Sequence, residues 1–304
     1  MRREEPTLAA ALRDRFPERS WNEVRRLCET GKVRVDDRIV VDPATRISPG
    51  ARIDVNPTAP KPRPAMPGFR VEYEDEHLIV IEKPAGTSSV PYERKETGTA
   101  LDLIRTHWRH GPRRRGGATA TPLYTVHRLD KETSGLLCFG KTRAAERGLH
   151  DIFQQHRAAR LYLAVAHGAV LPGRIESRLV PDRGDGLRGS TRDLRLGQHA
   201  VTHVEILERL PAATTCRIRL ETGRTHQIRI HLAEAGHPIV GDAVYTRDRA
   251  LAGERVLASE RLMLHATTLG FDHPVTGKRI ELSSAPPPEF LSVLARLGGG
   301  TPWQ

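Results

Sequence analysis

Asp130 lies in the stretch HRLDKETSGLL at residues 127–137, shortly after His127 and Arg128 and before a Thr-Ser-Gly turn. An aspartate in such a place is most often a turn or cap residue, because its side chain accepts hydrogen bonds from nearby backbone N–H groups. A carboxylate held near cations can also stay ionised when it is buried, and it can then act as a nucleophile or a base. These residues therefore leave two interpretations open, one structural and one catalytic.

The usual signatures of metal-dependent and hydrolytic enzymes do not accompany this aspartate. The sequence has no HExxH and no zinc-deaminase signature, and Ser134 lacks the surrounding Gly-x-Ser-x-Gly of a hydrolase. His226 and His231 are five residues apart, a spacing that does not place both on one helix face. We therefore expect no metal site, and the carboxylate among arginines is the chemistry that remains.

The composition favours a partner that is a polyanion. The chain of 304 residues has 48 Lys and Arg against 37 Asp and Glu, a net charge of +11. An arginine-rich protein without such a partner is the alternative. The three cysteines form no CxxC pair, which fits a reducing compartment. The first twenty residues lack the apolar core of a signal peptide and no run is long enough to span a bilayer, so we expect a cytoplasmic protein without a membrane partner.

The N-terminal part of the chain has the pattern of a small separate domain. Apolar residues recur every fourth position from Leu8 to Phe16, as on one face of a helix. A capping box that begins at Ser20 predicts a second helix directly after it. The stretches KVRVDDRIVVD (32–42) and ARIDV (51–55) alternate as strands do.

This arrangement resembles the S4 RNA-binding domain, in which two helices and a few strands place basic residues against RNA. Two features depart from that family. Trp21 stands where the family usually carries a basic residue, and Asp36–Asp37 replaces its usual Asn-Gly turn. A domain that only covers its neighbour, with a solvated charged face, is the alternative.

The rest of the chain predicts an α+β domain behind a stiff linker. Proline-rich residues 58–68 predict that linker, between domains at 1–57 and 69–304. Many strands with few helices between them favour a mixed α and β sheet domain over a parallel βαβ fold. Strands are expected at 76–84, 136–139, 159–168, 202–210 and 214–223, a helix at 224–236 starting near Thr225, and surface loops at 105–115 and 181–197.

Three stretches, in order, resemble the RluA-type pseudouridine synthases, which isomerise uridine in structured RNA. They are IVIEKPAG (79–86), HRLDKETSGLL itself, and LETGRTHQIRIHLAEAGHPIVGDAVY (220–245). Between them, ARLYLAV (159–165) supplies the family's tyrosine as Tyr162, with Arg160 where lysine is usual. The resemblance spans about residues 69–285, and two long motifs in the right order favour the catalytic interpretation of Asp130.

The resemblance implies a largely antiparallel central sheet with a catalytic cleft, and an enzyme that acts on RNA, most simply large-subunit ribosomal RNA, as a monomer. It makes Asp130 the essential carboxylate and places Tyr162 against the target base. Arg229 is implied as the ion-pair partner of Asp130, with Arg224 as the alternative. The implied substrate-binding residues are Lys83, His127, Arg128, Arg224 and Gln227.

The reaction of this family detaches uracil from C1′, rotates it and rejoins it through C5. No metal, nucleotide or redox cofactor is needed, because nothing is oxidised and no group enters from solution. The acid could attack the sugar, attack the base or remove a proton, and the residues leave these three routes open. An RNA-binding or ribosome-assembly factor without turnover, and a base-removing glycosidase, are the alternative functions.

Overall fold

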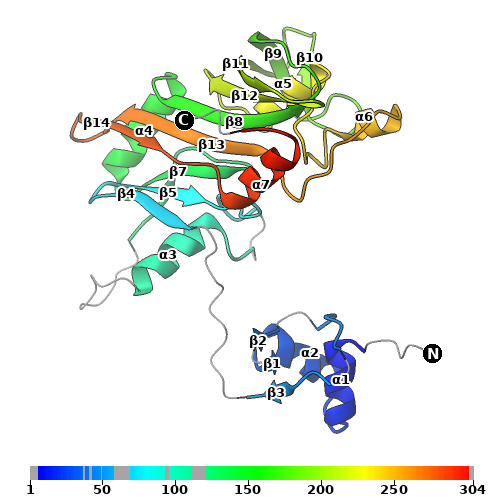
Figure 1. Cartoon of the computed structure of the whole chain (residues 1–304). Helices are drawn as coiled ribbons and strands as arrows, with labels where there is room; N and C mark the ends of the chain where they lie inside the picture. The colour runs from blue at the N-terminus through cyan, green and yellow to red at the C-terminus, as the bar shows by residue number, and fades with distance from the viewer. Residues whose placement is uncertain are drawn as a thin grey trace. The chain divides into compact units, whose positions relative to one another are not determined.

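The computed structural model describes residues 6–36, 38–40, 43–48, 50–57, 69–92, 96–110 and 121–300. The chain divides into two compact units, Met1–Met66 and Pro67–Gln304 (Figure 1). The predicted linker, residues 58–68, lies outside the described residues, and the domain boundaries inferred from the sequence stay a prediction.

The first unit packs two helices against a small antiparallel sheet. Its elements are α1 (Leu8–Arg15), α2 (Trp21–Glu29), β1 (Val33–Val35), β2 (Arg38–Ile39) and β3 (Ile53–Val55), with strand order β2-β1-β3. The predicted capping box is confirmed, because the Ser20 hydroxyl accepts from the backbone of Glu23 and the Glu23 carboxylate accepts from the backbone of Ser20. The two helices and β1 share a buried apolar cluster formed by Leu8, Leu12, Val24, Cys28, Val33 and Ile47.

The second unit is built on one long sheet. Its strands are β4 (Arg70–Glu74), β5 (Leu78–Lys83), β6 (Tyr124–Thr125), β7 (Ser134–Gly140), β8 (Ala159–His167), β9 (Gly173–Val180), β10 (Gly189–Thr191), β11 (Gln198–Arg209), β12 (Ala213–Leu220), β13 (Leu264–Asp272) and β14 (Arg279–Ser283). In the described part of this unit they form an eleven-stranded sheet in the order β10-β9-β11-β12-β8-β13-β7-β5-β4, with β14 beside β13 and β6 beside β7. Among these described strands, β13 and β7 pair in parallel and the other pairs are antiparallel. The predicted α+β class with a mixed, largely antiparallel sheet is confirmed.

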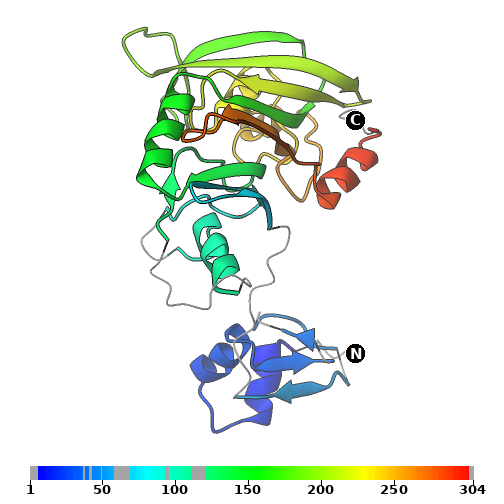
Figure 2. The same cartoon turned by 90° about the vertical axis from the view of Figure 1, so that its left-hand side faces the viewer.

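Alternate residues of the central strands enter two separate cores, so β5 is apolar on both faces. The helices of this unit are α3 (Ala100–His110), α4 (Arg143–Gln154), α5 (Gln227–Glu234), α6 (Arg247–Leu251) and α7 (Pro288–Arg296). Ile79 and Ile81 belong to the core that α3, α5 and α7 share, whereas Leu78 and Val80 belong to the core under α4. In Figure 2, α4 (green) and α7 (red) lie on opposite sides of this unit.

The expectation of a surface loop at 105–115 is wrong for the residues that the structure describes. Residues 105–110 continue α3, and residues 111–115 lie outside the described residues. The helix forms because Ala100 and Ile104 are buried against the sheet and Trp108 packs on the same core, at helical spacing. The stretch 105–115 contains five arginines, so its composition suggests a loop although its apolar residues continue a helical spacing.

Two further boundaries differ from the sequence prediction. The helix predicted from near Thr225 begins at Gln227, because His226 before it adopts a left-handed conformation (φ 58°). The predicted loop at 181–197 is mostly turns but contains β10. In the part of the chain that the structure describes, no helix is long and apolar enough to cross a membrane.

Candidate active site

Asp130 lies on the segment between β6 and β7, and its two chain neighbours are held by buried polar side chains. The Ser89 hydroxyl accepts from the backbone N–H of Leu129 at 3.0 Å and donates to the carbonyl of Leu129 at 2.8 Å. The Lys83 ammonium donates to the carbonyl of Lys131 at 3.0 Å. Pinning the residues on both sides limits the backbone freedom of Asp130, as a reacting group requires.

The Thr-Ser-Gly turn after Asp130 brings β7 against β13. The backbone N–H of Thr133 donates to the carbonyl of Asp130 at 3.1 Å and closes the turn. Gly135 follows with φ 113°, and a Cβ at that position would overlap the backbone of Ala266 on β13. A glycine is required here both for its conformation and for the close approach of the two strands.

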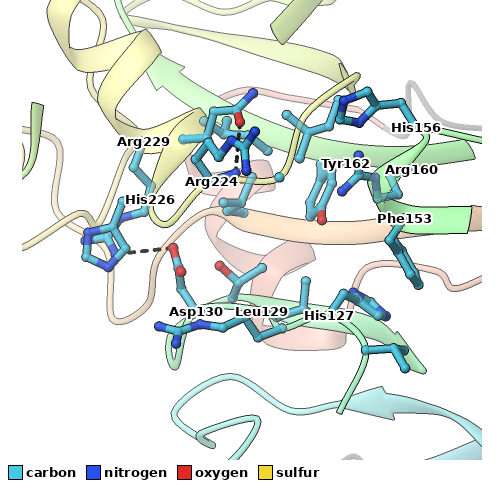
Figure 3. Close-up of a pocket in the computed structure, with 18 of the residues that line it drawn as sticks. His127, Leu129, Asp130, Phe153, His156, Arg160, Tyr162, Arg224, His226 and Arg229 are labelled. Atoms are coloured by element: carbon cyan, nitrogen blue, oxygen red, sulfur yellow. Dashed lines mark hydrogen bonds and ion pairs between the residues drawn. The ribbon is translucent and has the colours of Figure 1, made fainter. Parts of the chain in front are cut away.

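Arg229 on α5 makes the ion pair with Asp130. Its Nη1 lies 3.5 Å from Oδ2 of Asp130, and the two side chains come from positions 99 residues apart (Figure 3). The Asp130 side chain keeps 17% of its exposure, whereas the Arg229 side chain keeps 8%. The carboxylate is therefore open to a ligand while its cationic partner is buried behind it.

Asp242 orients Arg229. Oδ2 of Asp242 accepts from Nε at 2.7 Å and Oδ1 accepts from Nη2 at 2.9 Å, a bidentate pair that leaves Nη1 directed at Asp130. Oδ1 also accepts from the backbone N–H groups of Val244 and Tyr245. Burial alone would raise the pKa of Asp242, but Arg229 and these backbone donors lower it, so the carboxylate is ionised.

A cavity of about 370 Å³ opens beside Asp130 and holds Tyr162 in its wall. Tyr162 lies on β8 and is 8% exposed. Burial raises the pKa of its phenol, and Asp130 adds to that effect against the opposing charge of Arg160, so the hydroxyl keeps its proton at neutral pH. Asp130, Tyr162 and Arg229 thus line one cavity, as Figure 3 shows.

The structure gives the other predicted cleft residues different surroundings. His127 and Arg128 line the cavity. Burial lowers the pKa of His127 to about 3, so its ring is neutral. The ring stacks on Phe153 and accepts at Nε2 from the backbone N–H of Cys138. Arg128 is exposed, so a ligand can reach its side chain. Arg224 also lines the cavity, yet its Nε donates to the carbonyl of His199, and within the described residues it forms no ion pair with Asp130.

Gln227 also lies in the cavity wall, but its hydrogen bonds stabilise the protein's own structure. It is 2% exposed, and its amide oxygen accepts from the Thr222 hydroxyl and the backbone of Arg224. Its amide nitrogen donates to the carbonyl of Val201 and the hydroxyl of Thr202. All four hydrogen bonds of the amide are therefore used within the protein, and none is left for a substrate.

Lys83 does not reach the cavity, contrary to the role expected of it as a substrate-binding residue. Its side chain is fully buried and donates to the carbonyls of Pro84, Thr87 and Lys131 at 2.7–3.0 Å. Burial lowers the pKa of Lys83 to about 7. Because these three hydrogen bonds are made within the protein, Lys83 holds the segment that carries Asp130.

Lys83→Met should destabilise the protein by roughly 2–4 kcal/mol, because three carbonyls lose a partly buried hydrogen bond from a fully buried side chain. Turnover should also fall, since the carbonyl beside Asp130 is released. Thermal unfolding measures the first effect, and the exposed Lys278→Met is the matched control, expected to stay within about 0.5 kcal/mol of wild type. Equal stabilities of the two variants would contradict this role.

Comparison of the sequence with known proteins identifies a family, and comparison of the structure finds the same fold in a solved protein. The family model for RNA pseudouridylate synthase matches residues 77–234, and the S4 domain model matches residues 8–53. A ribosomal large subunit pseudouridine synthase D of Zymomonas mobilis is 34% identical over 83% of this chain and 81% of that protein. The chain belongs to the RNA pseudouridylate synthase family. A Neisseria meningitidis protein of the same name is 35% identical over 95% of this chain and 78% of its own length. The solved human RNA pseudouridylate synthase domain containing 4 shares the fold, with a TM-score of 0.60 and 24% identity over 75% of this chain and 92% of that chain.

Several residues in or directly behind the cavity wall were not singled out from the sequence. Asp242 and Tyr245 fall within the third motif but give no local sign of their partners, since Arg229 lies far from them in sequence. His226 lines the cavity beside Asp130, and its Nδ1 lies 3.0 Å from the Tyr245 hydroxyl. Phe153 supplies the ring under His127 from α4. Only the tertiary fold brings each of these residues to its partner.

Two glycine motifs typical of nucleotide-binding proteins occur in the chain without the backbone that such motifs require. Residues 135–142, GLLCFGKT, match GxxxxGK[ST], but the four residues between the glycines are buried in β7 and pair with β5. Residues 184–189, GDGLRG, match GxGxxG but lead into β10 and not into a helix. The first segment is a strand where a phosphate-binding loop is required, and the second is not followed by a helix, so neither match supports a nucleotide site. Among the described residues, no cluster of His, Cys, Asp or Glu could hold a metal ion.

Proposed function

We propose that this RNA pseudouridine synthase acts on uridines of ribosomal large-subunit RNA and that Asp130 is its reactive carboxylate. The names of the relatives from Zymomonas and Neisseria support the large subunit as target. The S4 match supports RNA binding by the first unit, ahead of a basic second unit. We also propose that the protein works as a monomer in the cytoplasm.

The observation that carries the role of Asp130 is its ion pair with Arg229 at the wall of the cavity. The pair sets a cation against the carboxylate that the reaction needs, whether the acid attacks the sugar, attacks the base or removes a proton. The buried guanidinium can also stabilise the negative charge of the detached uracil.

Tyr162 completes the proposed chemistry. Its ring offers a surface on which the detached base can turn, and its protonated hydroxyl can exchange a proton at C5. A uridine of folded RNA must leave its stack to enter the cavity, at a cost of a few kcal/mol, and phosphate contacts to exposed side chains such as Arg128 offset that cost.

The target is tested by mapping pseudouridines in the ribosomal RNA of a strain that lacks this gene. One or more large-subunit pseudouridines should be missing and should return when the wild-type chain is supplied. A complete large-subunit set in the deletion strain would overturn the proposed target. Abasic sites in place of pseudouridine when the wild-type chain is supplied would instead indicate a glycosidase.

A further inference from the structure

A second, larger cavity adjoins the first across Asp130. It has a volume of about 690 Å³, within the range of ligand pockets. Its wall shares with the first cavity the residues Arg128, Leu129, Asp130, His226 and Arg229. Two ligand groups, one in each cavity, are therefore separated by the Asp130 segment.

The far wall of this second cavity is a turn at residues 88–92 that is held in shape without a ligand. One oxygen of Glu96 accepts from the Ser88 hydroxyl and the other accepts from the backbone N–H of Tyr92, both at 2.6 Å. These two hydrogen bonds, that of Ser88 first, lower the pKa of Glu96 and keep it ionised. Ser89 ties the same turn to the Asp130 segment. The wall is thus preorganised.

Tyr92 is the most exposed large hydrophobic side chain of the described residues, at 90%. It lies in the wall of the second cavity, next to Val90 and Pro91. The cationic Arg128 and Lys131, both exposed, line the same cavity. A free aromatic ring beside apolar groups and cations is the composition that binds unpaired nucleotides, because bases stack on rings and phosphates contact cations.

We propose that the second cavity binds the nucleotide next to the target uridine on the same RNA strand, with its base stacked on Tyr92 and its phosphate beside Lys131. This inference rests on the proposed function. The substrate is a polymer, so a uridine in the first cavity must have a neighbour one phosphate away, and the second cavity adjoins the first at Asp130. The cavity then gives the enzyme a requirement for an unstacked neighbour beside its uridine.

The test uses the full chain and large-subunit ribosomal RNA transcribed with uridine tritiated at C5, whose release reports turnover. Tyr92→Ala should raise KM roughly tenfold, the factor that stacking of one base supplies, and leave kcat within about twofold. Tyr92→Phe should keep the wild-type KM, because stacking needs the ring and not the hydroxyl. Leu171→Ala, which removes another exposed apolar side chain (76%) that lines neither cavity, is the control and should match wild type.

The outcomes separate this inference from the proposed function. Absence of tritium release by the wild-type protein would overturn the proposed function itself. Release by wild type with an unchanged KM in Tyr92→Ala would overturn the second cavity as a nucleotide site. A rise in KM of equal size in Tyr92→Phe would overturn stacking as the means of recognition. Circular dichroism of each variant confirms that the exposed substitutions leave the fold intact.

Discussion

Asp130→Asn should lower tritium release from C5-labelled ribosomal RNA by about 10³-fold or more. Asparagine keeps the shape of the side chain and can still meet Arg229, but it has no negative charge with which to act as a nucleophile or a base. Because the cavity and the exposed cations are unchanged, the affinity for the same RNA should remain within about threefold of wild type, and removal of a negative charge can only favour a polyanion. Single-turnover release and filter binding measure the two quantities.

Two controls make this result decisive. Asp130→Ala cannot revert by deamidation, so residual activity of the asparagine variant that alanine lacks would be traced to regenerated aspartate. Asp151→Asn removes an exposed acid of α4 and should release tritium as wild type does. Release by Asp130→Ala within tenfold of wild type would remove this carboxylate from the mechanism. Binding without release by the wild-type chain would favour the assembly-factor alternative.

The sequence predicted the parts of the site that short motifs carry. Asp130, Tyr162 and Arg229 each lie in a motif, and the apolar run of β5 and the alternation in β12 predict strands of the observed sheet. Capping at Ser20 likewise depends on neighbours three residues apart. Such features are local, so they can be read before the fold is known.

What the sequence could not predict depends on contacts between distant segments. Arg224 and Arg229 are equivalent by type and motif, but Arg229 lies on α5 and pairs with Asp130 and Asp242, whereas Arg224 precedes the helix and donates to the carbonyl of His199. Lys83 has the charge of an RNA contact, yet complete burial directs it to three carbonyls. Exposure and partner therefore decide the role of an ionisable residue, and neither can be read from spacing.

Asp242→Asn should lower kcat by about 10²-fold, although residue 242 need not touch the substrate. An asparagine offers one acceptor and one N–H₂ group to a guanidinium that only donates, so the bidentate pair is lost and Arg229 turns away from Asp130. KM should change by less than about threefold, because the exposed cations at the cavity, Arg128 and Lys131, are untouched. Breaking a buried pair also destabilises the protein, by roughly 3–5 kcal/mol, so kcat is measured at a temperature where the variant is folded.

Asp75→Asn is the matched control for a purely structural effect. Asp75 also accepts from two backbone N–H groups, those of His77 and Leu78, and pairs with a buried partner, His273, but that partner, unlike Arg229, does not line the cavity. It should lose stability while kcat stays within about twofold. Equal losses of kcat in the two variants would reduce Asp242 to a folding role.

A double-variant cycle with Arg229→Lys tests whether Asp242 acts through Arg229. Lysine keeps the charge but has no planar fork, so it cannot hold Asp242 by two parallel bonds while it faces Asp130. Each single variant should lower kcat, and the double variant should lose little beyond the more damaged single one, because both changes remove the same orientation. Losses that simply multiply would show that the two residues act independently. Non-additive losses would identify the buried Asp242–Arg229 pair as the support that aims a cation at the reactive carboxylate.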